Sequence, residues 1–279
     1  MSLKTKRKIV LIVMLVMLSL FTLIYIYPVF LMFMNSFKPF GEVVSDPIAL
    51  PKKPTTENFI YVANKIHYLQ LFMNNVLITA IGILGIVFFS SLAAYILDRR
   101  KNDYTKLIYG IIITPMLIPF QTIMITLLKA MNIIHLDQSK VGLGIQYWGF
   151  GIPMATFIFF NFMKTIPKEI DESAEIDGAS TWKTYCAIIF PLIKPVCFTV
   201  IVLDVMWIWN DFLLPLLMVN SSTKTKTLVL AAYTFVGQMN TKWQYAMASM
   251  TLTVLPSILI FILLQKYIVE GVVAGAVKG

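Results

Sequence analysis

Charged residues, histidine and cysteine are all scarce in this chain of 279 residues. Only 13% of its residues are charged, whereas a soluble globular domain has about a quarter. Two histidines, His67 and His135, are too few for a histidine metal cluster or for general-base chemistry inside a membrane. The two cysteines, Cys186 and Cys197, do not predict a disulfide. Because 58% of the residues are hydrophobic, the composition indicates an integral membrane protein.

Two common catalytic motifs are also missing. The chain has no G-x-x-x-x-G-K-[ST] loop to cradle nucleotide phosphates and no G-x-S-x-G nucleophile elbow. We therefore expect no catalytic residue, no metal site and no cofactor bound by this chain. If the protein drives transport uphill, the energy must come from another polypeptide or from an ion gradient.

Six apolar runs approach or exceed the roughly 20 residues that cross a bilayer as a helix. They predict spans at about Ile9–Met34, Leu71–Leu97, Leu107–Leu128, Val141–Phe162, Pro195–Val219 and Met247–Tyr267. The first run is too long for a signal peptide and no cleavage site follows it. We expect a short N-terminal segment, residues 1–8, followed by one transmembrane domain over residues 9–279.

Basic residues indicate the orientation of the spans. A tight cluster (Arg99, Arg100, Lys101 and Lys106) lies between the second and third runs, and short basic loops stay in the cytoplasm. Both termini and residues 167–195 are then cytoplasmic as well. Much of the net charge of +9 lies next to the ends of the spans, where anionic lipid headgroups and topology explain it. We therefore expect no nucleic acid partner.

Small residues are frequent in the second and fourth runs, and small residues let helices approach closely in lipid. The glycines among them are Gly82, Gly85, Gly142, Gly144, Gly149 and Gly151. They suit packing inside this chain, packing against a second membrane subunit, or both.

The most polar long stretch is Pro167–Pro195, which reads PKEIDESAEIDGASTWKTYCAIIFPLIKP. Pro167 suits a first helical turn, and the acidic residues that follow favour the positive end of the helix dipole. Gly178 can supply a left-handed exit. A second helix at Trp182–Phe190 would be capped by Ser180 or Thr181 and stopped by Pro191 and Pro195. The residues alone leave open whether this is a docking surface or a solvated acidic loop.

The same stretch resembles the "EAA…G…I-x-L-P" signature of membrane subunits of ABC importers. Glu172-Ser173-Ala174 is followed by Gly178 and then by Ile188-Ile189-Phe190-Pro191. Ser173 and Phe190 depart mildly from that signature. The longer stretch looks like the maltose-type carbohydrate branch, as do NNVLITAIGILGIVFFSSLAAYILDR, WNDFLLPL at Trp209–Leu216 and the ending QKYIVEGVVAGAVKG.

The resemblance implies a fold and a set of partners. The fold is that of an all-α membrane protein, a type I ABC importer permease with six transmembrane helices, a cytoplasmic coupling helix and cytoplasmic termini. The coupling segment, residues 167–191, would dock on a cytoplasmic ATPase. Its ATPase-coupling residues would be Glu172, Ser173, Ala174, Asp177, Gly178 and Pro191.

The implied partners are a second homologous permease, two ATP-binding-cassette ATPase subunits, an extracytoplasmic sugar-binding protein and membrane lipids. ATP and Mg²⁺ would be bound by the ATPase subunits. The protein would lie in the cytoplasmic membrane of a bacterium or an archaeon. The transported solute would be a carbohydrate, and transport would occur by alternating access.

Polar residues in the fifth run are candidates for the translocation path, because ionisable groups inside a bilayer are costly. They are Asp204, Trp209, Asn210 and Asp211. The alternative is that both aspartates bond to neighbouring helices and Trp209 fills space. In the external loop Asn220–Ala246, Tyr233 and Phe235 are candidate contacts for the binding protein, unless that loop is an interfacial anchor.

Other functions remain open from the sequence. The nearest alternative is a permease of an ABC importer for an amino acid, peptide or polyamine. The WNDF stretch and the C-terminal ending argue against this alternative. A secondary transporter or channel would need no acidic docking segment and more often shows inverted repeats. A membrane enzyme is the most distant, because the chain lacks a catalytic constellation.

Overall fold

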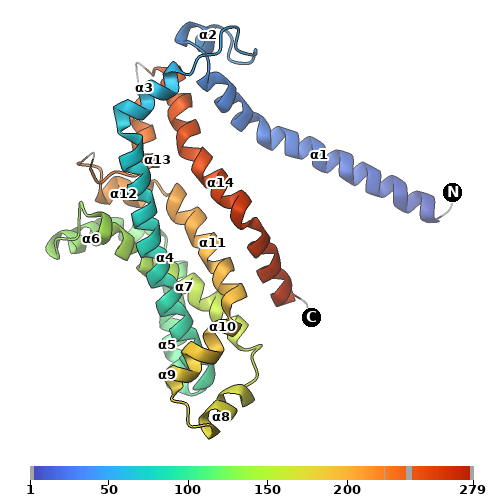
Figure 1. Ribbon diagram of the computed structural model, residues 1–279, viewed down its shortest axis with the longest axis vertical. Helices are drawn as coiled ribbons and strands as arrows, with labels where there is room; N and C mark the ends of the chain where they lie inside the picture. The colour runs from blue at the N-terminus through green and yellow to red at the C-terminus, as the bar shows by residue number, and fades with distance from the viewer. Residues whose placement is uncertain (1–2, 223, 237–240, 277–279) are drawn as a thin grey trace. The chain divides into compact units, whose positions relative to one another are not determined.

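Helices make up the regular secondary structure of residues 3–222, 224–236 and 241–276, which the computed structural model describes (Figure 1). In chain order the first are α1 (Leu3–Ser36), α2 (Phe40–Ser45), α3 (Glu57–Ile66), α4 (Tyr68–Arg99), α5 (Asp103–Ile113), the 3-10 turn η1 (Thr114–Leu117), α6 (Phe120–Ile133) and α7 (Lys140–Met163). Then follow α8 (Glu169–Ile176), α9 (Thr181–Thr184), the π-helical turn η2 (Tyr185–Ile189), α10 (Phe190–Leu192), α11 (Lys194–Asn210), α12 (Leu213–Met218), α13 (Leu228–Ala232), the 3-10 turn η3 (Tyr233–Phe235) and α14 (Trp243–Ala276).

The chain forms two compact units. The first lies within Met1–Tyr68 and Ala231–Leu255, and the second within Leu69–Leu230 and Pro256–Gly279. Helix α14 therefore contributes to both. The polar segment with the importer signature lies wholly in the second unit.

Among the described residues, four helices are long and apolar enough to cross a membrane. They run over Thr5–Ser36, Tyr68–Arg99, Lys140–Met163 and Trp243–Lys266. Two bent helix pairs have the same apolar character, and they bring the number of candidate spans to six if each pair is one span. The all-α membrane fold expected from the sequence is confirmed.

The third apolar run, expected as one helix at about Leu107–Leu128, is broken. The helical stretch Asp103–Leu117 meets Phe120–Ile133 at 103°. Pro115 lies inside the 3-10 turn and Pro119 directly precedes α6. Proline lacks an amide N–H and disfavours helical backbone in the residue before it, so two prolines four residues apart interrupt the helix.

The fifth apolar run also departs from one continuous helix. The second bent pair, Thr181–Leu192 and Lys194–Asn210, bends by 74° just before this run begins. Helix α11 then ends at Asn210, about nine residues before the expected end at Val219. Asp211 has extended backbone, and its carboxylate accepts from the amide of Leu213 in the following short helix α12.

The polar loop after α1, in the first unit, is held in place by side chains. Asn58 donates to the carbonyls of Ser36 and Lys38, each at 2.9 Å. The fully buried Lys38 ammonium donates to the carbonyl of Asp46 at 2.9 Å, which satisfies a charge that would otherwise be costly to bury. A hydrogen bond from the Ala49 amide holds the pKa of the Asp46 carboxyl below its usual value.

Glycines let α4 and α7 pack closely in the second unit. A methyl group at Gly85 would come within 2.1 Å of the Trp148 indole, and one at Gly151 within 2.3 Å of Ile86. The Trp148 indole N–H also donates to the carbonyl of Ile81 on α4 at 2.8 Å. Small residues in the second and fourth runs thus serve packing inside this chain, whereas a methyl group at Gly149 would meet open space.

Candidate functional site

The importer signature forms a short helix with a glycine exit, as the sequence predicts. Helix α8 carries three acidic residues in its first turn, where the helix dipole favours them. At its other end, the Gly178 amide donates to the carbonyl of Glu175 and the Ala179 amide to that of Ala174, both at 2.9 Å. This pair of bonds is a Schellman motif, and Gly178 has the positive φ of 77° that the motif requires.

The second helix of the segment is longer than predicted. Ser180 caps it by accepting from the Lys183 amide, and the chain stays helical from Thr181 to Leu192. Pro191 does not end this helix by itself, because it lies inside the helical stretch, directly after the π-helical turn η2 and Phe190. The helix ends at Leu192, between Pro191 and Pro195, and the chain bends at Ile193.

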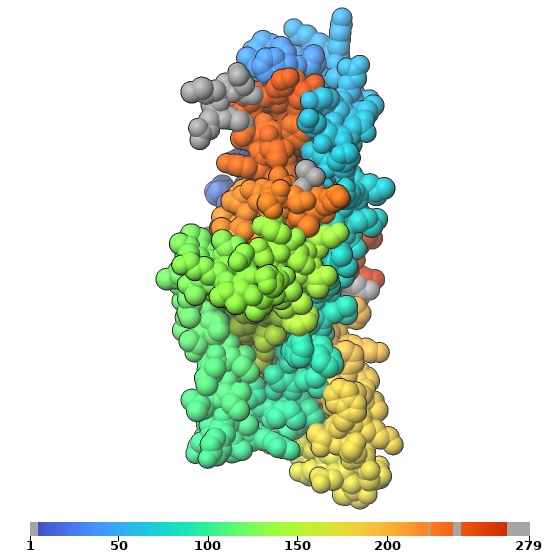
Figure 2. Space-filling model, turned by 90° about the vertical axis from the view of Figure 1, so that its left-hand side faces the viewer, coloured from blue at the N-terminus to red at the C-terminus, as the bar shows by residue number. Residues whose placement is uncertain are grey.

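Most of the predicted ATPase-coupling residues lie on an open surface at one end of the second unit (Figure 1). The exposed ones are Glu172, Ser173, Asp177, Gly178 and Pro191. The residues around α8, drawn in yellow, protrude at that end in Figure 2. Ala174 differs: it is 4% exposed, so it packs against this chain and leaves no open surface of its own.

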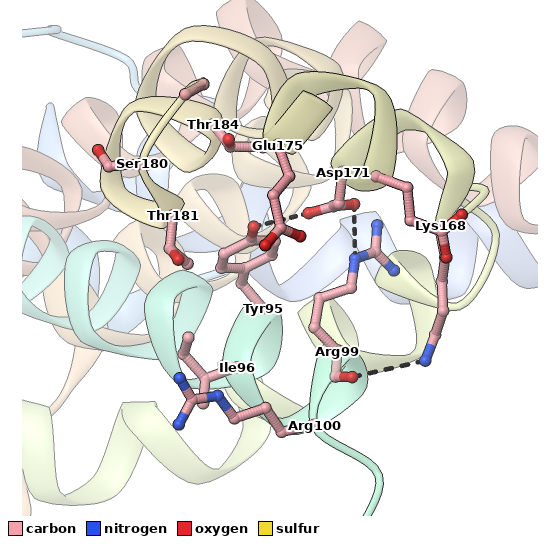
Figure 3. Close-up of a pocket in the computed structure, with 12 residues that line it drawn as sticks. Tyr95, Ile96, Arg99, Arg100, Lys168, Asp171, Glu175, Ser180, Thr181 and Thr184 are labelled. Carbon is pink, nitrogen blue, oxygen red and sulfur yellow. Dashed lines mark hydrogen bonds and ion pairs between the residues drawn. The ribbon is translucent and has the colours of Figure 1, made fainter. Parts of the chain in front are cut away.

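A carboxylate on α8 is bound by two side chains of α4 (Figure 3). The Tyr95 hydroxyl donates to Asp171 Oδ1 at 2.6 Å, and Arg99 Nε donates to Asp171 Oδ2 at 2.8 Å. Arg99 Nη1 in turn donates to Asp98 Oδ2 at 2.6 Å. Lys168, at the start of α8, donates to the Arg99 carbonyl at 3.5 Å. The segment is therefore connected to the C-terminal end of α4 by side chains far apart in sequence.

Polar bonds and apolar packing both connect α8 to the rest of the unit. Helix α8 buries Ala174, whose methyl group contributes about 0.8 kcal/mol, and the partly buried Ile170 packs against the hydrophobic core. A hydrogen bond to a charged group contributes roughly 1.5–3 kcal/mol. The side chains of Arg99 and Asp171 are only 11% and 19% exposed, so water and salt screen the pair weakly. Polar bonds are thus a substantial part of the attachment of α8 to the rest of the unit.

A cleft of about 550 Å³ opens between the end of α4 and the α8–α9 turn. Its lining is Tyr95, Ile96, Arg99, Arg100, Lys168, Asp171, Glu172, Glu175, Ala179, Ser180, Thr181 and Thr184. Figure 3 shows Glu175 and Arg100 on opposite sides of it. A cleft with both charges and several hydroxyl groups suits a polar protein segment better than an apolar ligand.

The four candidate path residues do not form one cluster. Asp204 and Trp209 are buried on α11, and the Trp209 ring lies edge-on to Phe72 at 5.5 Å between centroids. Asn210 is exposed and donates to the carbonyl of Met206 within its own helix at 2.7 Å. The partner of Asp211 is Tyr147 on α7, whose hydroxyl donates to Asp211 Oδ2 at 2.9 Å.

The sequence did not indicate the contacts of Tyr147, Tyr95 and Arg99. Nothing in the local sequence around Tyr147 distinguishes it from a packing aromatic. Arg99 was assigned only to membrane topology, because a basic residue at a span end is explained by that rule alone. A spacing of four residues from Tyr95 to Arg99 puts them on one face of α4, which is the one signal present in the sequence.

The external loop contains both candidate contacts for a binding protein. Tyr233 is 57% exposed, and the Phe235 ring lies 6.4 Å from that of Tyr245. Residues 223 and 237–240 of the predicted loop lie outside the described residues. The apolar part of the loop is not an exposed amphipathic face, because Leu228 and Leu230 are buried.

The polar start of this loop is held by side chains of other elements. Asn74 on α4 donates to the carbonyls of Lys224 and Lys226, each at 3.0 Å. Ser221 donates to the side chain of Gln138 through both its amide and its hydroxyl. These bonds span up to 152 residues of sequence, so the loop has a defined path.

Comparison with known proteins identifies the family. Residues 86–273 match the family described as the inner membrane component of binding-protein-dependent transport systems. The chain belongs to this family. It is a multi-pass protein of the cytoplasmic membrane and a subunit of an ABC importer. Membership in this family implies an ATPase partner and a binding protein.

Several relatives are similar over nearly their whole length. A probable starch degradation products transport system permease from Thermoanaerobacterium thermosulfurigenes is 38% identical over 91% of this chain and 92% of its own. A multiple sugar-binding transport system permease from Streptococcus mutans is 32% identical over 90% and 91%. A melibiose/raffinose/stachyose import permease from Bacillus subtilis is 31% identical over the same shares.

The fold is similar to that of a solved importer subunit. One chain of a bacterial ABC transporter that imports the acidic polysaccharide alginate superposes with a TM-score of 0.81. The match covers 94% of this chain and 97% of that chain at 21% identity. The ABC importer permease fold is therefore confirmed.

Proposed function

We propose that this subunit forms part of the alternating-access pathway for an oligosaccharide. The observation that carries the proposal is that relatives 31–38% identical over nine-tenths of both chains are named as permeases for sugars or starch products. An extracytoplasmic sugar-binding protein delivers the solute. A second, homologous permease completes the pathway.

Two ATPase subunits supply the energy, and one of them docks on α8. The exposed Glu172 and Asp177 offer negative charge for basic residues of the ATPase, and the Schellman turn at Gly178 keeps the helix short. ATP and Mg²⁺ bind to the ATPase subunits. The role of this chain at α8 is to present a rigid docking surface to the ATPase.

The orientation follows from the basic residues near the span ends. The N- and C-termini and α8 lie in the cytoplasm, and the loop around Tyr233 lies outside. Labelling of single cysteines by a membrane-impermeant maleimide tests this orientation. In intact cells of a Cys186→Ser, Cys197→Ser background, a cysteine at exposed Ile176 should stay unlabelled.

Uptake by the purified complex in proteoliposomes tests the function. We expect a labelled maltodextrin or raffinose-type oligosaccharide to accumulate only with ATP inside and the binding protein outside. Accumulation of amino acids or peptides with no accumulation of any carbohydrate would contradict the proposal. The subunit purified alone should hydrolyse no ATP, and vanadate-sensitive turnover by it would contradict the assignment of that chemistry to the partners.

A further inference from the structure

We infer that three residues of α4, Ser91, Tyr95 and Arg99, bind both helices of the coupling segment and make α8 move together with α4. We call these three residues the α4 stripe. The inference rests on the proposed function, because it states how movement of an ATPase on α8 reaches a membrane span. It assigns a positioning role to residues outside the importer signature.

The α4 stripe lies on one face of its helix. Its members are four residues apart, and residues at that spacing stand one above the other on a helix. Ser91 and Tyr95 are buried, with 0% and 4% of their surface exposed, and the Arg99 side chain is 11% exposed. The stripe therefore faces the interior of the unit and makes its contacts there.

Each member of the stripe contacts the coupling segment. Ser91 Oγ and the Tyr185 hydroxyl are 2.7 Å apart, which joins α4 to the helix after the glycine turn. The Tyr95 and Tyr185 rings pack with centroids 5.4 Å apart. Tyr95 and Arg99 then bind the two oxygens of Asp171 on α8. The stripe thus spans the Gly178 turn and binds the segment on both sides of it.

Two donors on one carboxylate fix its orientation as well as its position. A single hydrogen bond would let α8 rotate about that bond. Asp171 instead accepts hydrogen bonds on both oxygens, from Tyr95 on Oδ1 and from Arg99 on Oδ2. Arg99 cannot swing away easily, because Asp98 and the carbonyl of Ile166 also hold its guanidinium. The attachment is therefore rigid at both ends.

The remaining links of α8 are fewer. It buries Ala174 and packs the partly buried Ile170 against the core, and its exit turns on a glycine, the residue with the greatest backbone freedom. Without the stripe, a push on α8 would be taken up partly by that turn. With the stripe, the push reaches α4, and through the close Gly85–Trp148 and Gly151–Ile86 contacts it reaches α7.

The test measures coupling in the whole importer. Tyr95→Phe and Asp171→Asn each remove one part of the attachment while keeping the shape of the side chain. Arg99 is left unchanged, because its loss would strand the buried Asp98. We expect the complex to assemble with its ATPase and to hydrolyse ATP, but to spend severalfold more ATP per transported solute than the parental complex, because part of the movement of α8 no longer reaches α4.

Matched controls exist on the same side of the membrane. Tyr104→Phe and Asp103→Asn make the same chemical changes at exposed positions of α5, where Tyr104 is 79% exposed and the Asp103 side chain 96%. Both should keep the parental ratio of ATP to solute. The double variant of Tyr95 and Asp171 should be little worse than Asp171→Asn alone, since both act on one carboxylate.

A distance measurement separates this role from a merely structural one. In a Cys186→Ser, Cys197→Ser background, spin labels on exposed Phe88 of α4 and Ile176 of α8 report their separation. We expect one narrow distribution, unchanged between the nucleotide-free and vanadate-trapped complexes, and a broad one in Asp171→Asn. A parental distance that shifts on trapping would overturn the inference, as would parental coupling in both variants or loss of the ATPase from them.

The outcomes also distinguish this inference from the proposed function. If the parental complex accumulates no carbohydrate, the proposed function fails, while the distance measurement still decides whether α8 and α4 move together. If carbohydrate accumulates but the variants couple normally, only the role of the α4 stripe fails.

Discussion

The hydroxyl of Tyr147 on α7 donates to Asp211 Oδ2 at 2.9 Å, at the point where α11 ends. Asp211 accepts from the Leu213 amide with its other oxygen, so one carboxylate joins α7 to the start of α12. This bond answers part of the question that the sequence left open. Asp211 bonds to a neighbouring helix, and a role in the path stays a proposal.

We predict that Tyr147→Phe destabilises the protein without changing its fold. Tyr147 is fully buried, and the substitution removes one hydrogen bond to a carboxylate, a loss of roughly 1.5–3 kcal/mol. The melting temperature of the purified protein in detergent should fall by several degrees. The control is Tyr104→Phe, which removes an exposed hydroxyl and should leave the melting temperature unchanged.

We predict that Gly178 is required for its backbone conformation rather than for space. A methyl group there would meet nothing within 4 Å, but its φ of +77° costs a branched residue about 1–2 kcal/mol. Gly178→Val should insert in the membrane but lose ATPase co-purification or uptake. Gly178→Asn should retain more of both, because asparagine tolerates this conformation. Equal activity of the two variants would show that the turn geometry is not needed.

We predict opposite effects for two glycines of the membrane helices. Gly85→Ala would place a methyl group 2.1 Å from the Trp148 ring, and such overpacking costs about 1–3 kcal/mol. Gly149→Ala meets open space, and alanine stabilises a helix interior by roughly 0.5–1 kcal/mol relative to glycine. Melting temperatures in detergent should fall for the first and not for the second. A drop of equal size in both would contradict the packing described for α4 and α7.

We predict that Asn75 stabilises the external loop. Its side chain donates to the carbonyl of Trp209 at 3.4 Å and accepts from the amide of Leu228 at 2.9 Å. Asn75→Leu would leave both backbone groups unpaired, at about 1–3 kcal/mol for each buried group. Hydrogen exchange at Leu228 should accelerate markedly. Asn161→Leu, at an exposed position where the amide bonds within its own helix, should not change it.

We predict that Gln138 supports signalling by the loaded binding protein. Gln138 holds Ser221 at the start of the external loop, so Gln138→Ala should free that part of the loop. Stimulation of ATP hydrolysis by the sugar-loaded binding protein should weaken, while basal hydrolysis stays parental. If stimulation is unaffected, the loop serves as an anchor and the proposed contact at Tyr233 and Phe235 loses its support.

Features that depend on neighbouring residues could be predicted from the sequence. Long apolar runs predicted α1, α4, α7 and α14, because helix formation in a bilayer depends on the run itself. The acidic first turn, the Gly178 exit and the Ser180 cap of the coupling segment were predicted for the same reason. The third and fifth runs were exceptions. Hydropathy predicts one helix for each, whereas Pro115 and Pro119 break the third and α11 ends at Asn210 within the fifth.

Features that depend on which helix faces meet were decided only by the tertiary structure. Tyr95 and Arg99 lie 76 and 72 residues from Asp171, and Tyr147 lies 64 residues from Asp211. From the local sequence alone, each of these residues can be explained without its long-range contact. It is an aromatic residue that packs, a basic residue that sets topology, or an acidic residue that suits the helix dipole. A hydrogen bond forms only where a donor and an acceptor lie within about 3 Å, and the packing of α4, α7 and α8 sets that separation.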